Sequence, residues 1–264
     1  GWAPKDLKYR WHWTFPIHIS EHKKHAVYVG SQYVHRSTDL GQSWEVISPD
    51  LTLNLKSHQQ SSGGIAIDNL MTFDGSVLFA INESSLKQGL IWVGSNDGQV
   101  HLTRNGGRTW INVSGNINMP PWGTISNIEA SRFDPKTAYI SVDFHQMGDF
   151  DPYIYKTTDY GKSWKKISGN IPRSYSSFVH VVKEDPKQES VLYAGTDNSV
   201  YVSVDGGDHW TKINSNLPPA PVYWITIQEH FDDMVIGTYG RGFYILDDIS
   251  PFREMANSNQ NEVN

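Results

Sequence analysis

The sequence of 264 residues contains no cysteine, and this absence excludes several kinds of chemistry. Disulfide frameworks, thiolate nucleophiles and Cys-ligated zinc sites all require a thiol group. The cellular compartment stays open, because a chain of this length buries a core large enough to be stable without disulfides.

Clustered positive charge and long apolar runs are also lacking. The chain has 22 basic and 28 acidic residues, a net charge of −6, and its Lys and Arg residues are scattered. A phosphate-backbone footprint, and hence a nucleic-acid partner, is therefore not expected. No apolar run approaches the ~18 residues that predict a transmembrane helix, and no charged segment followed by an apolar one opens the chain. The chain begins at Gly1 and not at Met, which indicates a processed chain or a portion of a longer one.

A repeated eight-residue pattern organises the sequence. It reads Ser/Thr-x-Asp/Asn-x-Gly-x-Ser/Thr/His-Trp and recurs at intervals of roughly 45 to 65 residues, close to the repeat of about 40 to 50 residues of propeller blades. The four copies are Ser37–Trp44, Thr103–Trp110, Thr157–Trp164 and Ser203–Trp210. We call them the motif turns.

Short strand patterns flank each motif turn. β-Branched and aromatic residues alternate between Gly, Asn and Asp turn signals, and no helical periodicity competes with them. The sequence therefore predicts an all-β fold, a β-propeller of four-stranded antiparallel blades with five blades countable in residues 1–253. The blades are expected at about residues 9–48, 76–114, 125–168, 178–214 and 223–248. Residues 254–264 have almost no apolar side chain and are expected to form a disordered tail or a linker.

The motif itself has a structural explanation. A short carboxylate or amide can accept backbone N–H groups in a tight reversal, glycine supplies positive φ, and the tryptophan packs between neighbouring blades. The alternative, that the acidic positions are catalytic or bind metal, is disfavoured because one copy carries an amide and the residues lie one per blade. The structural positions are Asp39, Trp44, Asn105, Trp110, Asp159, Trp164, Asp205 and Trp210.

This pattern resembles the Asp-box, or bacterial neuraminidase repeat, of sialidases, xyloglucan-active endoglucanases, sortilin-type receptors and photosystem assembly propellers. A closer resemblance is to large bacterial secreted proteins described as sortilin-like or glycosyl-hydrolase-like propellers. The segments that carry it are Tyr9–Thr14, Trp44–Thr52, Tyr155–Gly161 and Gly237–Asp248. The resemblance implies a secreted, periplasmic or cell-surface location and a chain that forms the closing portion of one propeller, with the remaining blades or domains elsewhere in a longer protein.

The fifth unit lacks a motif turn and an outer strand, so a partial propeller is expected. The alternative is a small ring of five units closed on itself, with the N-terminal segment completing the last blade. A sialidase is disfavoured, because Ile171–Arg173 reverses the Arg-Ile-Pro signature that the resemblance would require. The first functional hypothesis is a non-catalytic interaction propeller that binds a protein or a glycan. The alternatives are a glycoside hydrolase with paired carboxylates in the axial cleft, and an assembly factor that scaffolds a membrane complex.

A binding site is expected on the face opposite the motif turns, which holds the longer loops. One such loop, between the first two blades, carries Ser61–Gly64. Another carries Asp143, His145, Asp149 and Asp151, which could bind a hard cation or furnish a general acid and base; the alternative is a solvated acidic loop. No cofactor and no metal are predicted.

Aromatic residues and one arginine complete the candidates for this face. Trp122, Tyr223 and Trp224 lie beside prolines and would form a rigid platform for sugar rings or a partner's loop, although Trp224 could instead pack in the core. Arg241 follows Tyr239 between two glycines and could clamp a carboxylate, or pair with Asp247 or Asp248. A second group near the N-terminus has the same two interpretations, a ligand-binding role or a structural one. Its members are Arg10, Trp11 and Trp13, and core packing is expected of Trp13.

Overall fold

The computed structural model describes residues 4–60, 76–213 and 216–262, and these form five antiparallel sheets, which we call blades 1 to 5. Blade 1 consists of β1 (Ile17–Ile19), β2 (Val27–Gly30), β3 (Val34–Ser37) and β4 (Glu45–Val46). Blade 2 consists of β5 (Leu78–Glu83), β6 (Ile91–Ser95), β7 (Val100–Thr103) and β8 (Ile111–Asn112). Blade 3 consists of β9 (Thr124–Ala130), β10 (Ala138–Asp143), β11 (Tyr153–Thr157) and β12 (Lys165–Lys166).

The last two blades differ from each other in strand number. Blade 4 consists of β13 (Val179–Glu184), β14 (Leu192–Thr196), β15 (Val200–Ser203) and β16 (Thr211–Lys212). Blade 5 has three strands, β17 (Val222–Gln228), β18 (Asp233–Thr238) and β19 (Phe243–Leu246). The single α-helix of the described residues, α1 (Ser250–Glu262), follows, and short 3₁₀ turns lie at Pro4–Asp6, Lys56–Gln59, Ser114–Asn116 and His145–Met147. No helix of the described residues is long and apolar enough to cross a membrane.

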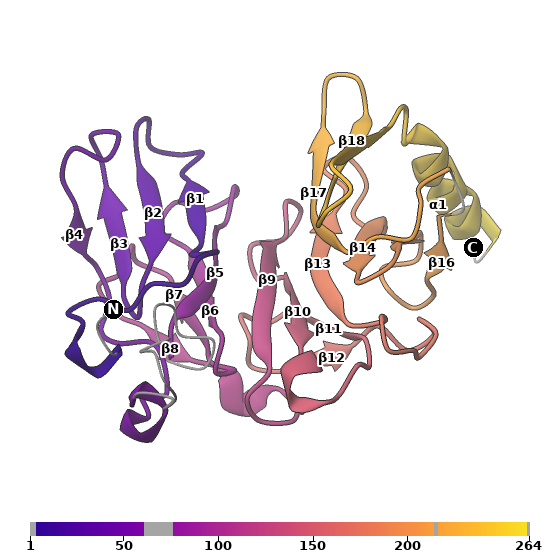
Figure 1. The fold of residues 1–264 in the computed structure, drawn as a ribbon. Coiled ribbons are helices and arrows are strands. Elements are labelled where there is room, and N and C mark those ends of the chain that lie inside the picture. The colour runs from indigo at the N-terminus through magenta and orange to yellow at the C-terminus, as the bar shows by residue number, and fades with distance from the viewer. Residues whose placement is uncertain (1–3, 61–75, 214–215, 263–264) are drawn as a thin grey trace.

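The blades succeed one another in chain order, with those nearest the two termini on opposite sides of the molecule (Figure 1). The first strand of each blade contacts the first strand of the next, so that β1, β5, β9, β13 and β17 line the inner side. The two end strands are uncovered, since Ile17 and Ile19 of β1 are 61% and 70% exposed and Trp224 of β17 is 54% exposed. This is the predicted β-propeller, open between blades 1 and 5.

The core lies between consecutive blades. Large side chains such as Trp92 and Ile125 are fully buried there, and neighbouring sheets approach so closely that a second-strand glycine is required. A Cβ on Gly94 would lie 2.4 Å from a methyl carbon of Ile125 in the next blade. The apolar residues of the predicted strands are therefore buried between sheets that pack face to face.

The four motif turns share one hydrogen-bond pattern, which is shown here for blade 3. The Asp159 carboxylate accepts the backbone N–H of Ser163 at 2.9 Å and its hydroxyl at 2.6 Å. The Thr157 hydroxyl donates to Asp159 and accepts the N–H of Gly161, whose φ is +78°. Equivalent bonds are made around Asp39, Asn105 and Asp205.

The motif tryptophans meet different surroundings. Trp210 is 4% exposed, and its Nε1 donates to the carbonyl of Ile167 in the preceding blade. Trp110 makes the same bond to Ile47, and Trp164 packs edge-on against Trp92. Trp44 is 44% exposed and bonds only to Gly41 of its own turn, because the described residues place no blade before blade 1.

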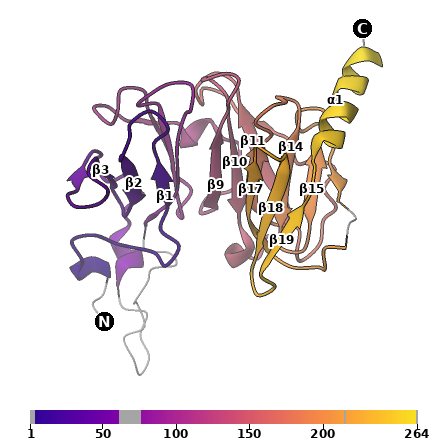
Figure 2. The ribbon, with the colours of Figure 1, turned by 90° about the horizontal axis from the view of Figure 1, so that it is seen from above.

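The expected disorder of residues 254–264 is corrected by helix α1, which covers residues 250–262 beside blades 4 and 5 (Figure 2). The Asp248 carboxylate accepts the N–H of Ser250 at 3.0 Å and so satisfies a free donor at the helix start. Arg253 joins the helix to Asp185 and Asp232 by ion pairs of 2.9 and 2.8 Å. The helix is thus held against the sheets by tertiary contacts, which its mostly polar sequence did not predict.

Candidate ligand-binding site

The blades have two ends, and we call the end where first strands begin and second strands finish the loop face. The four motif turns lie at the other end. Each blade places a polar or aromatic residue at the loop face where its second strand ends, in equivalent registers: Gln32, Asn96, Asp143, Asp197 and Tyr239. An arc of one such position per blade is a geometry suited to a ligand on the propeller axis.

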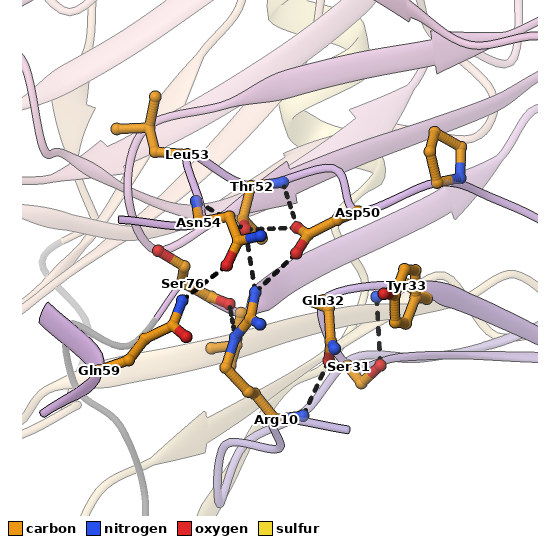
Figure 3. A network of polar contacts seen from close by, with 12 residues as sticks. Arg10, Ser31, Gln32, Tyr33, Asp50, Thr52, Leu53, Asn54, Gln59 and Ser76 are labelled. Carbon is orange, nitrogen blue, oxygen red and sulfur yellow. Dashed lines mark hydrogen bonds and ion pairs between the residues drawn. The ribbon is translucent and has the colours of Figure 1, made fainter. Parts of the chain in front are cut away.

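In blades 1 and 2 the loop face is filled by the protein itself. Arg10 is 3% exposed, and its guanidinium donates to Asp50, Thr52 and the carbonyl of Ser76 (Figure 3). Gln32 accepts the backbone N–H of Arg10 at 2.8 Å. Arg10 therefore anchors the N-terminal segment and does not face a ligand. The predicted Ser61–Gly64 segment lies outside the described residues.

In blade 3, Asp143 and His145 form a closely bonded pair. The Asp143 side chain is 10% exposed and accepts both the backbone N–H and the Nδ1 of His145, the latter at 2.7–2.8 Å. This hydrogen bond raises the pKa of His145 above its usual 6.5, against the opposing effect of burial. The imidazole therefore carries positive charge over a wider pH range than a free histidine.

A row of stacked rings runs from His145 across blades 3, 4 and 5. The His145 ring stacks on Phe178 at 4.7 Å, and Phe178 meets His180 edge-on at 5.0 Å. His180 stacks on Tyr223 at 4.0 Å, and Tyr223 contacts Tyr239 at 5.7 Å. We call these five residues the aromatic row.

The middle of the aromatic row is buried, and its blade 5 end is exposed. Phe178 and His180 are buried, whereas Tyr223 is 47% and Tyr239 74% exposed. His180 bonds to the Asp197 carboxylate at 3.1 Å, which gives a second acid–histidine pair. Burial, with smaller effects of Asp197 and Asp143, raises the pKa of Tyr223. The hydroxyl of this tyrosine therefore remains a neutral donor at physiological pH.

The four predicted residues of the blade 3 loop are divided between two places. Asp143 and His145 belong to the aromatic row, whereas Asp149 bonds to the hydroxyl of Tyr153 at 2.6 Å. Asp151 pairs with Arg173 at 2.5 Å. The last two acids line a separate open cavity of about 500 Å³ together with Phe150, Arg173 and Tyr175. Among the described residues, no group of three or more His, Asp or Glu side chains is placed to hold a metal ion.

The remaining candidates lie apart from the aromatic row. Trp122, with φ of +70°, stacks on His58 at 4.4 Å. Trp224 is exposed at the open edge of blade 5 and does not pack in the core. Arg241 is exposed in the turn before β19, and Asp248, a suggested partner, instead binds the backbone of Ser250.

The N-terminal aromatic residues show one further correction. Trp11 is half-buried and stacks on His35 at 5.1 Å. Trp13, for which core packing was expected, is 72% exposed, because the first strand of blade 1 has no preceding sheet to bury it in the described structure.

Sequence reasoning missed Phe178, His180, Asp197 and Arg173. Two of these carried a usable signal. Aligning the second strands of blades 3 and 4 puts Asp197 in register with Asp143, and His180 lies at the start of an inner strand. The stacking itself joins residues of three blades, and no local pattern reveals such contacts.

Comparisons with known proteins identify the fold. No family model matches the chain, and no curated protein matches it. The solved structures that resemble it include the GH74 xyloglucanase from Xanthomonas campestris, with a TM-score of 0.65 and 19% identity over 88% of this chain and 36% of that chain. YCF48 from Cyanidioschyzon merolae matches with a TM-score of 0.56 and 15% identity, over 89% of this chain and 66% of that one. The extracellular domain of a putative hybrid two-component system from B. thetaiotaomicron matches at 0.58 and 12%, over 89% and 26%.

These proteins establish the fold alone. At identities below 20% they share the blade architecture, and they include both an enzyme and proteins of other kinds. The chain spans about a third of the xyloglucanase it resembles. Function must therefore be argued from the side chains of this chain.

Proposed function

We propose that this chain is a non-catalytic interaction propeller that binds a glycan or a protein through the loop face of blades 3 to 5. The aromatic row carries this proposal. Its exposed end presents the rings of Tyr223 and Tyr239, and Tyr223 stacks on His180, which bonds to the Asp197 carboxylate. This combination suits stacking on a sugar ring with hydrogen bonds to its hydroxyl groups.

The acid–histidine pairs support binding over hydrolysis. A glycosidase needs two carboxyl groups free to act on one bond, one as acid and the other as base or nucleophile. In this site Asp143 is 10% exposed and bonded to His145, and Asp197 is bonded to His180. Each carboxylate orients a neighbouring ring, which is the role expected in a rigid recognition surface.

A glycan array followed by calorimetry with the best ligand tests the proposal. Tyr223→Ala and Tyr239→Ala should each weaken binding by about tenfold or more, as expected for aromatic contacts at a binding centre. Phe231→Ala is the matched control, because Phe231 is 67% exposed in the turn between β17 and β18, at the other end of the blade. Binding that all three variants leave unchanged would place the ligand elsewhere.

The second candidate is a carbohydrate-active hydrolase, favoured by the likeness to a xyloglucanase. Release of reducing ends from xyloglucan oligosaccharides, abolished in Asp143→Asn and Asp197→Asn, would establish it. Binding without release of reducing ends supports the interaction propeller instead.

The finer assignments belong to the same proposal. The motif turns support membership of the Asp-box propellers. The segments Tyr9–Thr14, Trp44–Thr52, Tyr155–Gly161 and Gly237–Asp248 support membership of the sortilin-like secreted group. We infer from that resemblance a secreted, periplasmic or cell-surface location, and from the exposed β1 and β17 that further blades complete the ring. Cell fractionation with an antibody to the chain tests the location.

A further inference from the structure

A second cavity of about 500 Å³ lies between the outer strands of blade 4 and the start of helix α1. It is lined on the blade 4 side by Val202, Val204, Thr211 and Ile213, and on the other by Leu246, Phe252 and Met255. This cavity is remote from the loop face, since it adjoins the motif turn of blade 4 through Asp205 and His209.

The residues on the blade 4 side have equivalents in blades 1 to 3. These equivalents contact the motif turn of the following blade. Register pairs Val202 with Thr211, as it pairs Lys156 with Lys165 in blade 3. In blade 3, Lys165 forms an ion pair with Asp208 of the next motif turn, at 2.8 Å. In blade 2, Arg104, the equivalent of Val204, lies over the Tyr160 ring of the next motif turn at 4.1 Å.

The position of Ile213 is the most informative. Its N–H bonds to the Val200 carbonyl, as Ile47 bonds to Val34 and Ile167 bonds to Ile154. The carbonyls of Ile47 and Ile167 accept the indole N–H of Trp110 and Trp210, from the motif turns of the following blades. The cavity beside Ile213 is therefore the seat of a motif turn, and we call it the blade 4 seat.

Blade 5 does not supply a turn to this seat. Leu246 stands in register where blades 1 to 4 have the Ser or Thr that begins the motif, and the chain then enters α1. In the described residues β19 has no fourth strand beside it, and its Phe243 and Ile245 are 82% and 63% exposed. A seat that no motif turn fills, bordered by Phe252 and Met255 of α1, thus lies next to an unpaired strand edge.

We propose that the blade 4 seat and the edge of β19 together bind an extended peptide segment that carries a tryptophan, and so complete blade 5. The indole enters the cavity and donates its N–H to the Ile213 carbonyl, as Trp110 and Trp210 do to their own seats. The residues after it pair with β19 as an added antiparallel strand. The occupant is identified by the chain itself, since the seats of blades 1 and 3 each hold a tryptophan that makes this bond, and Trp164 packs against Trp92 of blade 2 without it.

A peptide from the sequence of this chain can serve as the probe for this site. A capped peptide of residues 203–213 carries Trp210 and the strand that follows it, and is titrated against the full 264-residue chain by calorimetry. The peptide with Trp210→Ala should bind at least about tenfold more weakly, because the indole is the side chain that fills the cavity. Amide hydrogen exchange at residues 243–246 should slow in the presence of the unmodified peptide.

Three protein variants locate the binding. Val204→Glu places a charge in the seat and should abolish binding, whereas Val46→Glu, at a 45% exposed position on the outer strand of blade 1, should leave it unchanged. Val204→Trp fills the seat from within, so it should raise the Tm and block the peptide while the fold is kept. This variant keeps the proposal testable if Val204→Glu fails to fold.

The proposal is overturned by any of three results: no binding of the unmodified peptide at millimolar concentration, equal binding of the Trp210→Ala peptide, or equal loss of binding in Val46→Glu and Val204→Glu. Each would show that the cavity does not recognise an indole-bearing strand.

Discussion

The indole Nε1 of Trp210 in blade 4 donates a hydrogen bond of 2.6 Å to the carbonyl oxygen of Ile167 in blade 3. The same turn brings Gly207 so close to Ile167 that a Cβ would lie 2.6 Å from its terminal methyl. Trp210 therefore fixes the spacing of blades 3 and 4, through apolar burial and one directed bond.

Replacing Trp210 by alanine should reduce the free energy of unfolding by about 3–5 kcal/mol, as expected for removal of a large buried aromatic side chain. Trp44→Ala is the control, because Trp44 occupies the same motif position but is 44% exposed and has no blade beneath it in the described structure. Its cost should be below ~1 kcal/mol. Urea denaturation followed by circular dichroism measures both, and equal losses would contradict the packing role.

Asp159 should be replaceable by asparagine but not by alanine. In blade 2, Asn105 accepts the N–H of Thr109 at 3.0 Å and donates to its hydroxyl at 2.8 Å, so an amide satisfies the turn as a carboxylate does. Asp159→Asn should therefore change stability little, whereas Asp159→Ala should cost about 1–2 kcal/mol through lost hydrogen bonds. A large cost of the asparagine variant in thermal unfolding would indicate a role for the charge itself.

The sequence predicted the blades because each motif turn is local. Its polar residue, glycine and tryptophan lie within eight positions, and strand alternation follows from which face is buried. Helix α1 was missed for the opposite reason: its mostly polar residues show no core-forming pattern, and its anchor Arg253 finds Asp185 68 positions away. The Asp248 cap and Pro251 at the first turn were the available local signals.

The candidate site was predicted in part for similar reasons. Tyr223, Tyr239, Asp143 and His145 were proposed from the loops of the expected binding face, but their grouping depends on Phe178 and His180, which lie at the start of a buried strand. The same loop also carries Asp149 and Asp151, which the chain turns toward Tyr153 and Arg173. Sequence proximity alone does not distinguish these directions.

Glu184 should make stability depend on pH. It is 1% exposed, and burial raises its pKa to about 7 although Arg132, Ser131 and Tyr139 donate hydrogen bonds to it. The folded chain then holds a proton between pH 4.5 and 7 that the unfolded chain releases. The stabilisation that this proton gives the folded state is thus fully present below pH 4.5 and is lost as pH rises through 7.

Glu184→Gln keeps the neutral form at every pH. The Tm of this variant relative to the wild type should therefore rise between pH 5 and 8, by an amount equivalent to at most about 3 kcal/mol. The comparison must be differential, because burial lowers the pKa of His101 to about 4 and gives the wild type an opposite dependence in an overlapping range. Glu45→Gln, at an exposed position, serves as control, and parallel Tm curves for the two variants would refute the assignment.

The ion pairs of Arg253 should keep helix α1 packed against blades 4 and 5. Its guanidinium is 11% exposed and pairs with Asp185, whose side chain is fully buried and also accepts the hydroxyl of Tyr193 at 3.0 Å. Arg253→Met keeps the apolar stem but leaves a buried carboxylate without its counter-charge, which should cost about 3–5 kcal/mol.

Arg36→Met is the matched control for this arginine. Arg36 pairs with Glu45, whose side chain is 56% exposed, so its loss should cost less than ~1 kcal/mol. Limited proteolysis should cut the Arg253→Met chain after residue 249 at concentrations that leave the control intact, with a matching loss of helical circular dichroism. If both variants resist the protease equally, α1 is held by the packing of Phe252 and Ala256 and the ion pairs are dispensable.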